Sequence, residues 1–304
     1  MPPSASQYFI IAGPTALGKS ETAVALAERC AGEIIGADAF QVYRGLDILT
    51  AKPSPELRAR VPHHLIGEIP LTQSFDVAQY LDLARDRIAR IRARGRVPIV
   101  VGGTGMYLRA LMRGLADLPT ANAALRAELE TRPLAELQKK LVQLDPESGA
   151  TLDLNNPRRV VRALEVCLLT GRPFSSFREQ WTDQSPPVRG VVLTLDRATL
   201  NARIDHRAAA MLDAGVAGEV RLCGEIGPTA SQVLGLREVR AHLLGDLGRD
   251  ACIAALAQAT RHYAKRQMTW FRRESALEMI DTTALPSGEL IDRLVAKATA
   301  VIEP

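Results

Sequence analysis

The sequence predicts an α/β fold in which a parallel sheet is flanked by helices and interrupted by a helical insertion. Three short aliphatic runs, 8–12 (YFIIA), 33–37 (EIIGA) and 97–101 (VPIVV), are typical of buried strands. Two segments with apolar residues at helical spacing, 21–30 and 77–94, alternate with these runs along the chain. This alternation indicates a parallel sheet that helices cover on both faces.

The pattern changes between residues 118 and 189, where no convincing strand appears. The run 191–195 (VVLTL) then predicts a strand that rejoins the sheet, and the remaining chain is mainly helical. We therefore expect an α/β core formed by residues 1–117 and 190–304, with a helical insertion domain over 118–189. The segments with helical character in these later regions are 121–130, 134–144, 157–169 and 252–273.

The composition is that of a globular protein with a small basic excess. Of 304 residues, 47% are hydrophobic and 24% are charged, and a net charge of +4 with a pI near 9.0 suits a polyanionic partner. We expect a cytoplasmic monomer without membrane association, because the chain shows no leader, no long apolar run and no exposed apolar stripe. The scattered cysteines predict neither a disulfide framework nor a zinc site: Cys30, Cys167, Cys223 and Cys252.

A complete G-x-x-x-x-G-K-[ST] loop, GPTALGKS, lies directly after one predicted strand and before a helix. Its glycines allow backbone N–H groups to surround an anion, and the following helix adds its positive end. Lys19 supplies charge for terminal phosphates, and the Ser20 hydroxyl suits a Mg²⁺ ligand. The motif predicts a P-loop NTPase-like fold that binds a polyphosphate, either ATP or another donor. The predicted binding residues are Gly13, Pro14, Thr15, Ala16, Leu17, Gly18, Lys19 and Ser20.

Two aspartates follow predicted strands and are candidates for the acid of P-loop ATPases and kinases, Asp38 and Asp196. Asp196 is more simply a polar residue where a strand leaves the core. Asp38 is a catalytic base, a structural cap or a metal ligand. The strand 97–101 ends instead in Gly-Gly-Thr, which offers backbone groups and the Thr104 hydroxyl. The loop therefore predicts the fold without requiring ATP hydrolysis.

Six separate blocks resemble the tRNA dimethylallyltransferase family (tRNA isopentenyltransferases), in its bacterial type. They run in the family's order over nearly the whole chain. Two positions depart from the family pattern: Ala39 stands where Ser is usual, and Leu236 where Tyr is usual. The blocks are GPTALGKS (13–20), DAFQVYRGLDI (38–48) with TAKP (50–53), PHHL (62–65), GGTGMYLRAL (102–111), NPRRVVRALE (156–165) and TRHYAKRQMTWFR (260–272).

The resemblance implies a reaction in which an adenine exocyclic amine attacks dimethylallyl diphosphate and expels diphosphate. The adenosine is the one 3′-adjacent to the anticodon of tRNA. Asp38 would be the base that takes the amine proton. Lys19, the loop N–H groups, Thr104 and Mg²⁺ on Ser20 would stabilise the departing diphosphate. The resemblance adds Arg126 as a further catalytic candidate that faces phosphate or tRNA.

The resemblance also implies that the insertion domain contacts the anticodon stem-loop of tRNA. Arg158 and Arg162 share a helix face, and residues 261–273 contain five basic side chains and no acid. Without the resemblance these would read as solvated helix faces. Gln41 is expected to read a target base that leaves its stack. The predicted tRNA-binding residues are Asp38, Ala39, Phe40, Gln41, Arg158, Arg159, Val160, Val161, Arg162, Arg261, Lys265 and Arg272.

Two other functions are compatible with the phosphate loop. A small-molecule kinase would use ATP, with Asp38 as the base toward a hydroxyl, but it leaves the basic C-terminal helix unexplained. A nucleotide-dependent RNA-binding module would lack catalysis and would tolerate loss of Asp38. The two alternatives and the transferase differ in whether ATP is consumed and whether tRNA is modified.

Overall fold

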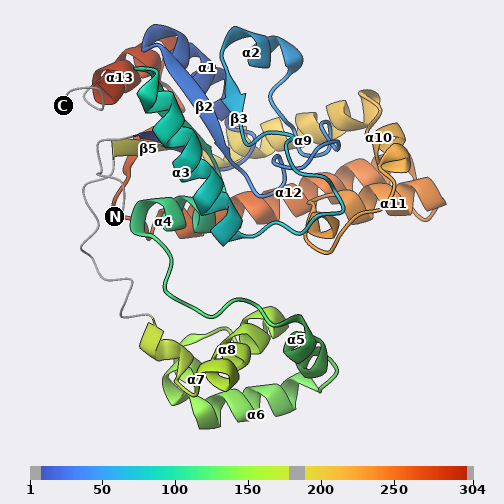
Figure 1. The fold of residues 1–304 in the computed structure, drawn as a ribbon. Coiled ribbons are helices and arrows are strands. Elements are labelled where there is room, and N and C mark those ends of the chain that lie inside the picture. The colour runs from blue at the N-terminus through green and yellow to red at the C-terminus, as the bar shows by residue number, and fades with distance from the viewer. Residues whose placement is uncertain (1–7, 178–188, 300–304) are drawn as a thin grey trace. The chain divides into compact units, whose positions relative to one another are not determined.

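The computed structural model describes residues 8–177 and 189–299 (Figure 1). The chain divides into two compact units, Met1–Met112 with Pro186–Pro304, and Arg113–Ser185. The second unit thus starts a few residues earlier than the residue 118 expected from the sequence, and its other boundary lies outside the described residues. Its first boundary coincides with the end of helix α4 (Gly105–Arg113). No helix within the described residues is long and apolar enough to cross a membrane.

The described part of the first unit contains one sheet of six strands, all parallel, in the order β3-β2-β4-β1-β5-β6. The four predicted strands correspond to β1, β2, β4 and β5, which confirms the α/β class. The edge strands β3 and β6 were not predicted, because runs of two and four residues carry too little pattern. The bounds are β1 (Phe9–Ala12), β2 (Gly32–Ala37), β3 (His63–His64), β4 (Val97–Gly102), β5 (Arg189–Thr194) and β6 (Glu278–Asp281).

The register of the central strands determines where the site forms. Ala12 of β1 and Ala37 of β2 both pair with Gly102 of β4, so these three strands end at the same level of one sheet edge. The residues that follow them therefore emerge side by side. This brings together the phosphate loop, Asp38 and the Gly103-Thr104 turn, which are far apart in the sequence.

Helices cover both faces of the sheet, as predicted (Figure 1). Side chains alternate along β1, so that Ile10 belongs to one buried cluster and Ile11 to the other. Helices α1 (Lys19–Arg29) and α13 (Ser287–Thr299) pack on the Ile11 side. The Ile10 side is covered by α3 (Val77–Ala93), α4, α9 (Arg197–Asp213), α10 (Val216–Leu222), α11 (Leu236–Leu244) and α12 (Arg249–Phe271), and the short α2 (Pro55–Arg60) packs beside α1.

The second unit has its own apolar core, formed by Leu129, Leu137, Leu141, Val160 and Leu164. This agrees with the helical insertion expected from the sequence, whose three predicted helices match α5, α6 and α8. Its helices are α5 (Ala123–Glu130), α6 (Leu134–Leu144), α7 (Pro146–Thr151) and α8 (Pro157–Thr170).

Candidate active site

The phosphate loop has the backbone geometry that its glycines allow. Gly13 has φ 147°, and a Cβ there would lie 2.6 Å from the carbonyl oxygen of Leu193. Gly18 has φ 96° and leads into α1, whose first turn has no side-chain cap. The uncapped N–H groups at the start of α1 are therefore available to an anion.

Lys19 extends across the loop, and its Nζ donates a hydrogen bond of 2.7 Å to the carbonyl oxygen of Pro14. Burial lowers the pKa of Lys19 to about 8, although the nearby carboxylate of Asp38 partly offsets this effect. A bound polyphosphate would supply the missing negative charge. The buried ammonium thus favours anion binding on electrostatic grounds.

Two arginines of α9 reach the same loop and were not identified from the sequence. Arg203 donates a hydrogen bond of 3.0 Å to the Leu17 carbonyl oxygen, and Arg207 donates one of 2.8 Å to the Thr15 hydroxyl. Burial lowers the pKa of Arg207, with an opposing effect from Asp38. The available signal was the spacing of two arginines at i and i+4 after the strand 191–195. It was ambiguous, because most such arginines lie on solvated faces.

Asp38 follows β2 and is anchored by the backbone beyond it. Its Oδ1 accepts hydrogen bonds from the N–H groups of Phe40 (2.9 Å) and Gln41 (3.2 Å). Thr104 joins this turn from the end of β4, since its Oγ1 accepts the Ala39 N–H at 3.0 Å. The carboxylate is therefore held in place through one oxygen, and Oδ2 accepts no hydrogen bond from the described residues.

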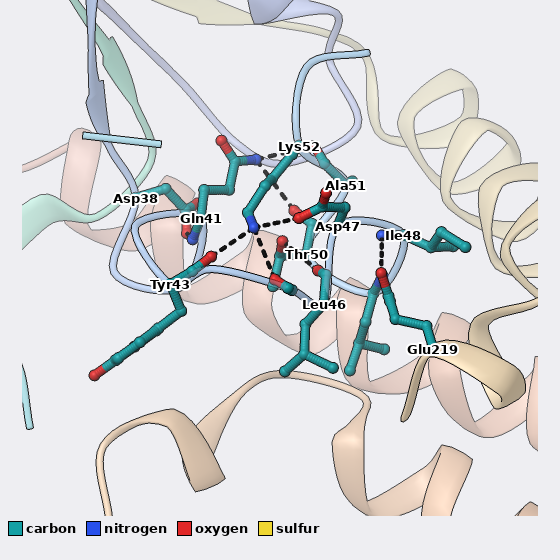
Figure 2. A network of polar contacts seen from close by, with 12 residues as sticks. Asp38, Gln41, Tyr43, Leu46, Asp47, Ile48, Thr50, Ala51, Lys52 and Glu219 are labelled. Atoms are coloured by element: carbon teal, nitrogen blue, oxygen red, sulfur yellow. Dashed lines mark hydrogen bonds and ion pairs between the residues drawn. The ribbon is translucent and has the colours of Figure 1, made fainter. Parts of the chain in front are cut away.

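The loop after Asp38 folds back on itself to form one wall of the site (Figure 2). Lys52 is buried, and its Nζ donates to the carbonyl oxygens of Tyr43 (2.5 Å) and Gly45 (2.7 Å) and to the carboxylate of Asp47. Glu219 of α10 accepts the N–H groups of Ile48 (2.8 Å) and Leu49 (2.9 Å). These contacts fix a segment that has no regular secondary structure.

One pocket of about 750 Å³ is lined by residues 15–20 of the phosphate loop, Asp38, Gln41, Lys52, Arg203 and Arg207. His206 of α9 lines the same pocket, and Asp38 and Gln41 lie at the sheet edge. A smaller cavity of about 50 Å³ adjoins it and shares Asp38 and Arg207. The apolar side chains around this second cavity are Phe40, Leu49, Ile204, Met211, Val233, Leu234 and Leu256.

Comparison with known proteins decides the family. The IPP transferase family model matches residues 41–274, well over half of the chain. The chain belongs to the IPP transferase family.

Named relatives cover almost the full length. The tRNA dimethylallyltransferases of Akkermansia muciniphila and Thermus thermophilus are 43% and 44% identical to this chain. The matches cover 90% of this chain and 92% of the first protein, and 92% of each chain for the second.

Two solved structures of the family have the same fold. The tRNA isopentenylpyrophosphate transferase of Bacillus halodurans is 36% identical, with a TM-score of 0.70 over 97% of both chains. A eukaryotic dimethylallyltransferase, solved acting on tRNA, is 27% identical with a TM-score of 0.78, over 91% of this chain and 74% of that chain.

The structure brings together four features of the first unit that were predicted from the sequence: the phosphate loop, Asp38, Thr104 and Gln41. The phosphate loop and Asp38 face one pocket, and Thr104 supports the Asp38 turn. Gln41 lines the same pocket, but its Nε2 already donates to the carbonyl oxygens of Thr50 (3.1 Å) and Ala51 (2.9 Å). Only the Oε1 atom of Gln41 is then left to contact a base.

The two departures from the family pattern have different surroundings. Ala39 keeps its backbone N–H on Thr104 and is half-buried. Leu236 is buried at the start of α11 within the core cluster. The leucine therefore fills a packing position.

Asp196, the other aspartate after a strand, is the N-cap of α9 and accepts the Thr199 N–H at 2.9 Å. Its interpretation as a polar residue at a strand exit is confirmed.

In the second unit, a buried carboxylate organises two of the predicted arginines. Glu165 is fully buried, and it accepts two hydrogen bonds from Arg126, at 3.0 and 2.9 Å. Arg162 donates to the same carboxylate at 2.5 Å, and the Asn122 N–H donates to it at 2.7 Å. Arg126 and Arg162 thus have a structural partner, which the sequence interpretation did not include.

Two predicted tRNA-binding residues are corrected by the structure. Val160 and Val161 are 0% and 5% exposed and belong to the core of the second unit. Their side chains pack α8 against its neighbours and are not available to an RNA surface. Arg158 and Arg159, at the start of the same helix, are exposed. Within the block 156–165, the predicted contact with RNA therefore rests on the arginines alone.

The basic residues of α12 differ in exposure. Arg261 forms an ion pair with Asp205 of α9, whereas Lys265 is exposed on the following turn. Arg272 is exposed where the helix ends. Tyr263 and Gln267 of the same helix point inward, which separates a basic outer face from a face that contacts the site.

Proposed function

We propose that this protein transfers a dimethylallyl group from dimethylallyl diphosphate to the exocyclic amine of the tRNA adenosine 3′-adjacent to the anticodon. The observation that carries this function is one pocket in which a phosphate-binding loop and the Asp38 carboxylate meet. Relatives named tRNA dimethylallyltransferase support it, as does a related eukaryotic enzyme solved acting on tRNA. Family membership does not support the small-molecule kinase.

Asp38 acts as the general base. The adenine nitrogen forms a bond to C1 of the prenyl group while the bond from C1 to the diphosphate oxygen breaks. The amine is a poor nucleophile, so its proton passes to Asp38 as the new bond forms. Oδ1 is held by two backbone N–H groups, which leaves Oδ2 to receive the proton.

The departing diphosphate gains negative charge, which the phosphate loop stabilises. Lys19, Arg203 and Arg207 supply three cations, and the start of α1 supplies backbone N–H groups. In the structure these side chains donate to loop oxygens, so their positions are already set before an anion arrives. Such preorganisation lowers the reorganisation needed during the reaction.

Mg²⁺ fits the donor set of this pocket. The Ser20 hydroxyl lines it and offers an oxygen atom, the kind of ligand that Mg²⁺ prefers. The described residues contain no group of three or more metal-binding side chains, so diphosphate oxygens and water would complete the coordination. A bound Mg²⁺ would neutralise charge on the diphosphate, with Ser20 as its protein ligand.

The prenyl chain occupies the small cavity beside Asp38. Its wall includes Leu49, Ile204, Met211 and Leu256, and it shares Arg207 with the phosphate pocket. A donor whose diphosphate lies on Lys19 would place its apolar tail next to these side chains.

The tRNA is bound by exposed basic residues, among them Arg158, Arg159, Lys265 and Arg272, which contact its phosphates.

The direct test incubates the protein with Mg²⁺, dimethylallyl diphosphate labelled in the prenyl group, and unmodified tRNA with adenosine 3′ of the anticodon. Label is expected on tRNA, and the label should be lost when that adenosine is replaced by guanosine. A parallel reaction contains ATP without tRNA. Consumption of ATP together with no label on tRNA would favour a kinase instead.

A further inference from the structure

The carboxamide of Gln267 is buried between the two loops that form the site. Its Oε1 accepts the N–H of Thr15 in the phosphate loop at 2.9 Å, and its Nε2 donates to the carbonyl oxygen of Gly103 at 3.0 Å. The residue is 6% exposed and comes from α12, more than 160 positions away from either partner. One side chain therefore joins the ends of β1 and β4.

The fit around this amide is tight. A Cβ added to Gly103 would lie 2.1 Å from Nε2 of Gln267 and 3.0 Å from the Gly13 carbonyl oxygen. A Cβ on Gly105 would lie 2.4 Å from the Trp270 ring, one turn further along α12. The turn after β4 thus lies directly against the helix, and glycine is needed where the amide contacts it.

Both hydrogen bonds of the amide depend on its orientation. A reversed carboxamide would place its NH₂ group against the Thr15 N–H and its oxygen against the Gly103 carbonyl, and both contacts would repel. Gly103, whose carbonyl oxygen accepts the Nε2 hydrogen bond, is directly followed by Thr104, whose Oγ1 accepts the Ala39 N–H at 3.0 Å. The contacts of Gln267 therefore connect Thr15 to the Gly103-Thr104 turn, which supports the Asp38 turn.

We propose that Gln267 is a positioning residue that sets the distance between the phosphate loop and the Asp38 turn. The Thr15 N–H and hydroxyl flank the place of the diphosphate, while Thr104 holds the turn that carries the base. Loss of the amide would let the two loops shift independently. This inference rests on the proposed function only for the identity of the donor.

The test compares Gln267→Met with Gln258→Met, a matched change at an exposed position of α12. Methionine keeps the length of the side chain but removes the acceptor and the donor. We expect the KM for dimethylallyl diphosphate to rise about tenfold or more in Gln267→Met, because the loop loses a buried hydrogen bond. The KM for tRNA should change little, since the exposed basic residues are untouched. Gln258→Met should match the wild-type protein.

A double-mutant cycle separates positioning from general stability. Gly103→Ala should impair the wild-type background strongly, because the new methyl group meets the amide. It should cost much less in a Gln267→Ala background, where that amide is absent. Equal losses in both backgrounds would overturn the inference, as would a Gln267→Met protein whose lower Tm is accompanied by unchanged kinetic constants.

Binding of inorganic diphosphate, measured by calorimetry, gives a readout that does not depend on transfer. The dissociation constant should increase in Gln267→Met and stay the same in Gln258→Met. If the wild-type protein transfers no prenyl group, the proposed function fails, yet this comparison still tests whether Gln267 positions the phosphate loop. An unchanged dissociation constant in Gln267→Met would overturn the positioning role of Gln267 even in an active transferase.

Discussion

The guanidinium of Arg207 donates a hydrogen bond of 2.8 Å to the hydroxyl of Thr15, which joins residues 192 positions apart. The contact attaches α9 to the phosphate loop and places a half-buried cation in the same pocket as Lys19 and Asp38. A P-loop alone supplies one lysine, and here α9 adds two arginines. The cationic side of the pocket therefore comes from two elements that are distant in the sequence.

The first prediction concerns Arg207→Ala. Removing a charged donor beside the diphosphate should raise the KM for dimethylallyl diphosphate by about 10- to 100-fold, with a smaller change in the KM for tRNA. Steady-state kinetics with each substrate varied in turn would measure this. Arg197→Ala, at an exposed position of the same helix, is the control. Equal effects of the two substitutions would argue against a role for Arg207 in donor binding.

The second prediction compares the two aspartates that follow strands. Asp38→Asn keeps an oxygen for the Phe40 and Gln41 N–H groups but removes the base, so kcat should fall by about 10²- to 10⁴-fold. Binding of tRNA, measured by filter retention, should persist. Asp196→Asn should leave kcat unchanged, because asparagine is also a good N-cap for α9. A normal kcat in Asp38→Asn would exclude Asp38 as the base.

The third prediction follows from the pKa of Lys19, which burial lowers to about 8. A bound diphosphate stabilises the ammonium and raises this pKa. Below pH 8 the free protein already carries the charge, whereas above pH 8 binding must also take up a proton. The affinity for diphosphate should therefore fall as the pH rises from 7 to 9.

Lys19→Arg provides the reference for this titration, because a guanidinium stays charged over the whole range. Diphosphate itself titrates, so the informative quantity is the ratio of the two dissociation constants at each pH. The ratio of the wild-type constant to that of Lys19→Arg should increase above pH 8. Parallel curves would mean that Lys19 stays protonated in the free protein.

The fourth prediction concerns the buried Glu165 of the second unit. Glu165→Gln removes the counter-charge of Arg126 and Arg162 and turns one buried acceptor oxygen into a donor, so the free energy of unfolding of this unit should fall by about 1–3 kcal/mol. Glu128→Gln breaks an exposed i,i+4 pair with Arg132 and should cost at most about 0.5 kcal/mol. Limited proteolysis within 113–185 would distinguish the two variants. Equal resistance would show that the pair around Glu165 contributes little.

The fifth prediction concerns Lys52, whose buried ammonium contacts three oxygens of the loop after Asp38 (Figure 2). Lys52→Met should loosen this loop and lower the free energy of unfolding by about 2–3 kcal/mol, because carbonyl groups lose a charged donor. Thermal melting would measure the change, and Lys139→Met at an exposed position is the control. An unchanged Tm would mean that Glu219 and the backbone hold the loop without Lys52.

The sequence was sufficient where the information is local. The phosphate loop needs adjacent glycines, a lysine and a hydroxyl, so its fold and its affinity for an anion follow from contiguous residues. The strands 8–12, 33–37, 97–101 and 191–195 were predicted because buried parallel strands are aliphatic over their whole length. The helices of the insertion were predicted from another local pattern, the regular spacing of their apolar residues.

The tertiary structure decided which polar residues share a site. Arg207 and Gln267 look like ordinary helix residues in the sequence, and only the packing of α9 and α12 against the sheet edge brings them to Thr15. Burial likewise turned Val160 into a core residue and made Glu165 the partner of Arg126. Local patterns determine which elements form, whereas the chemistry of a pocket depends on side chains from elements that meet only after folding.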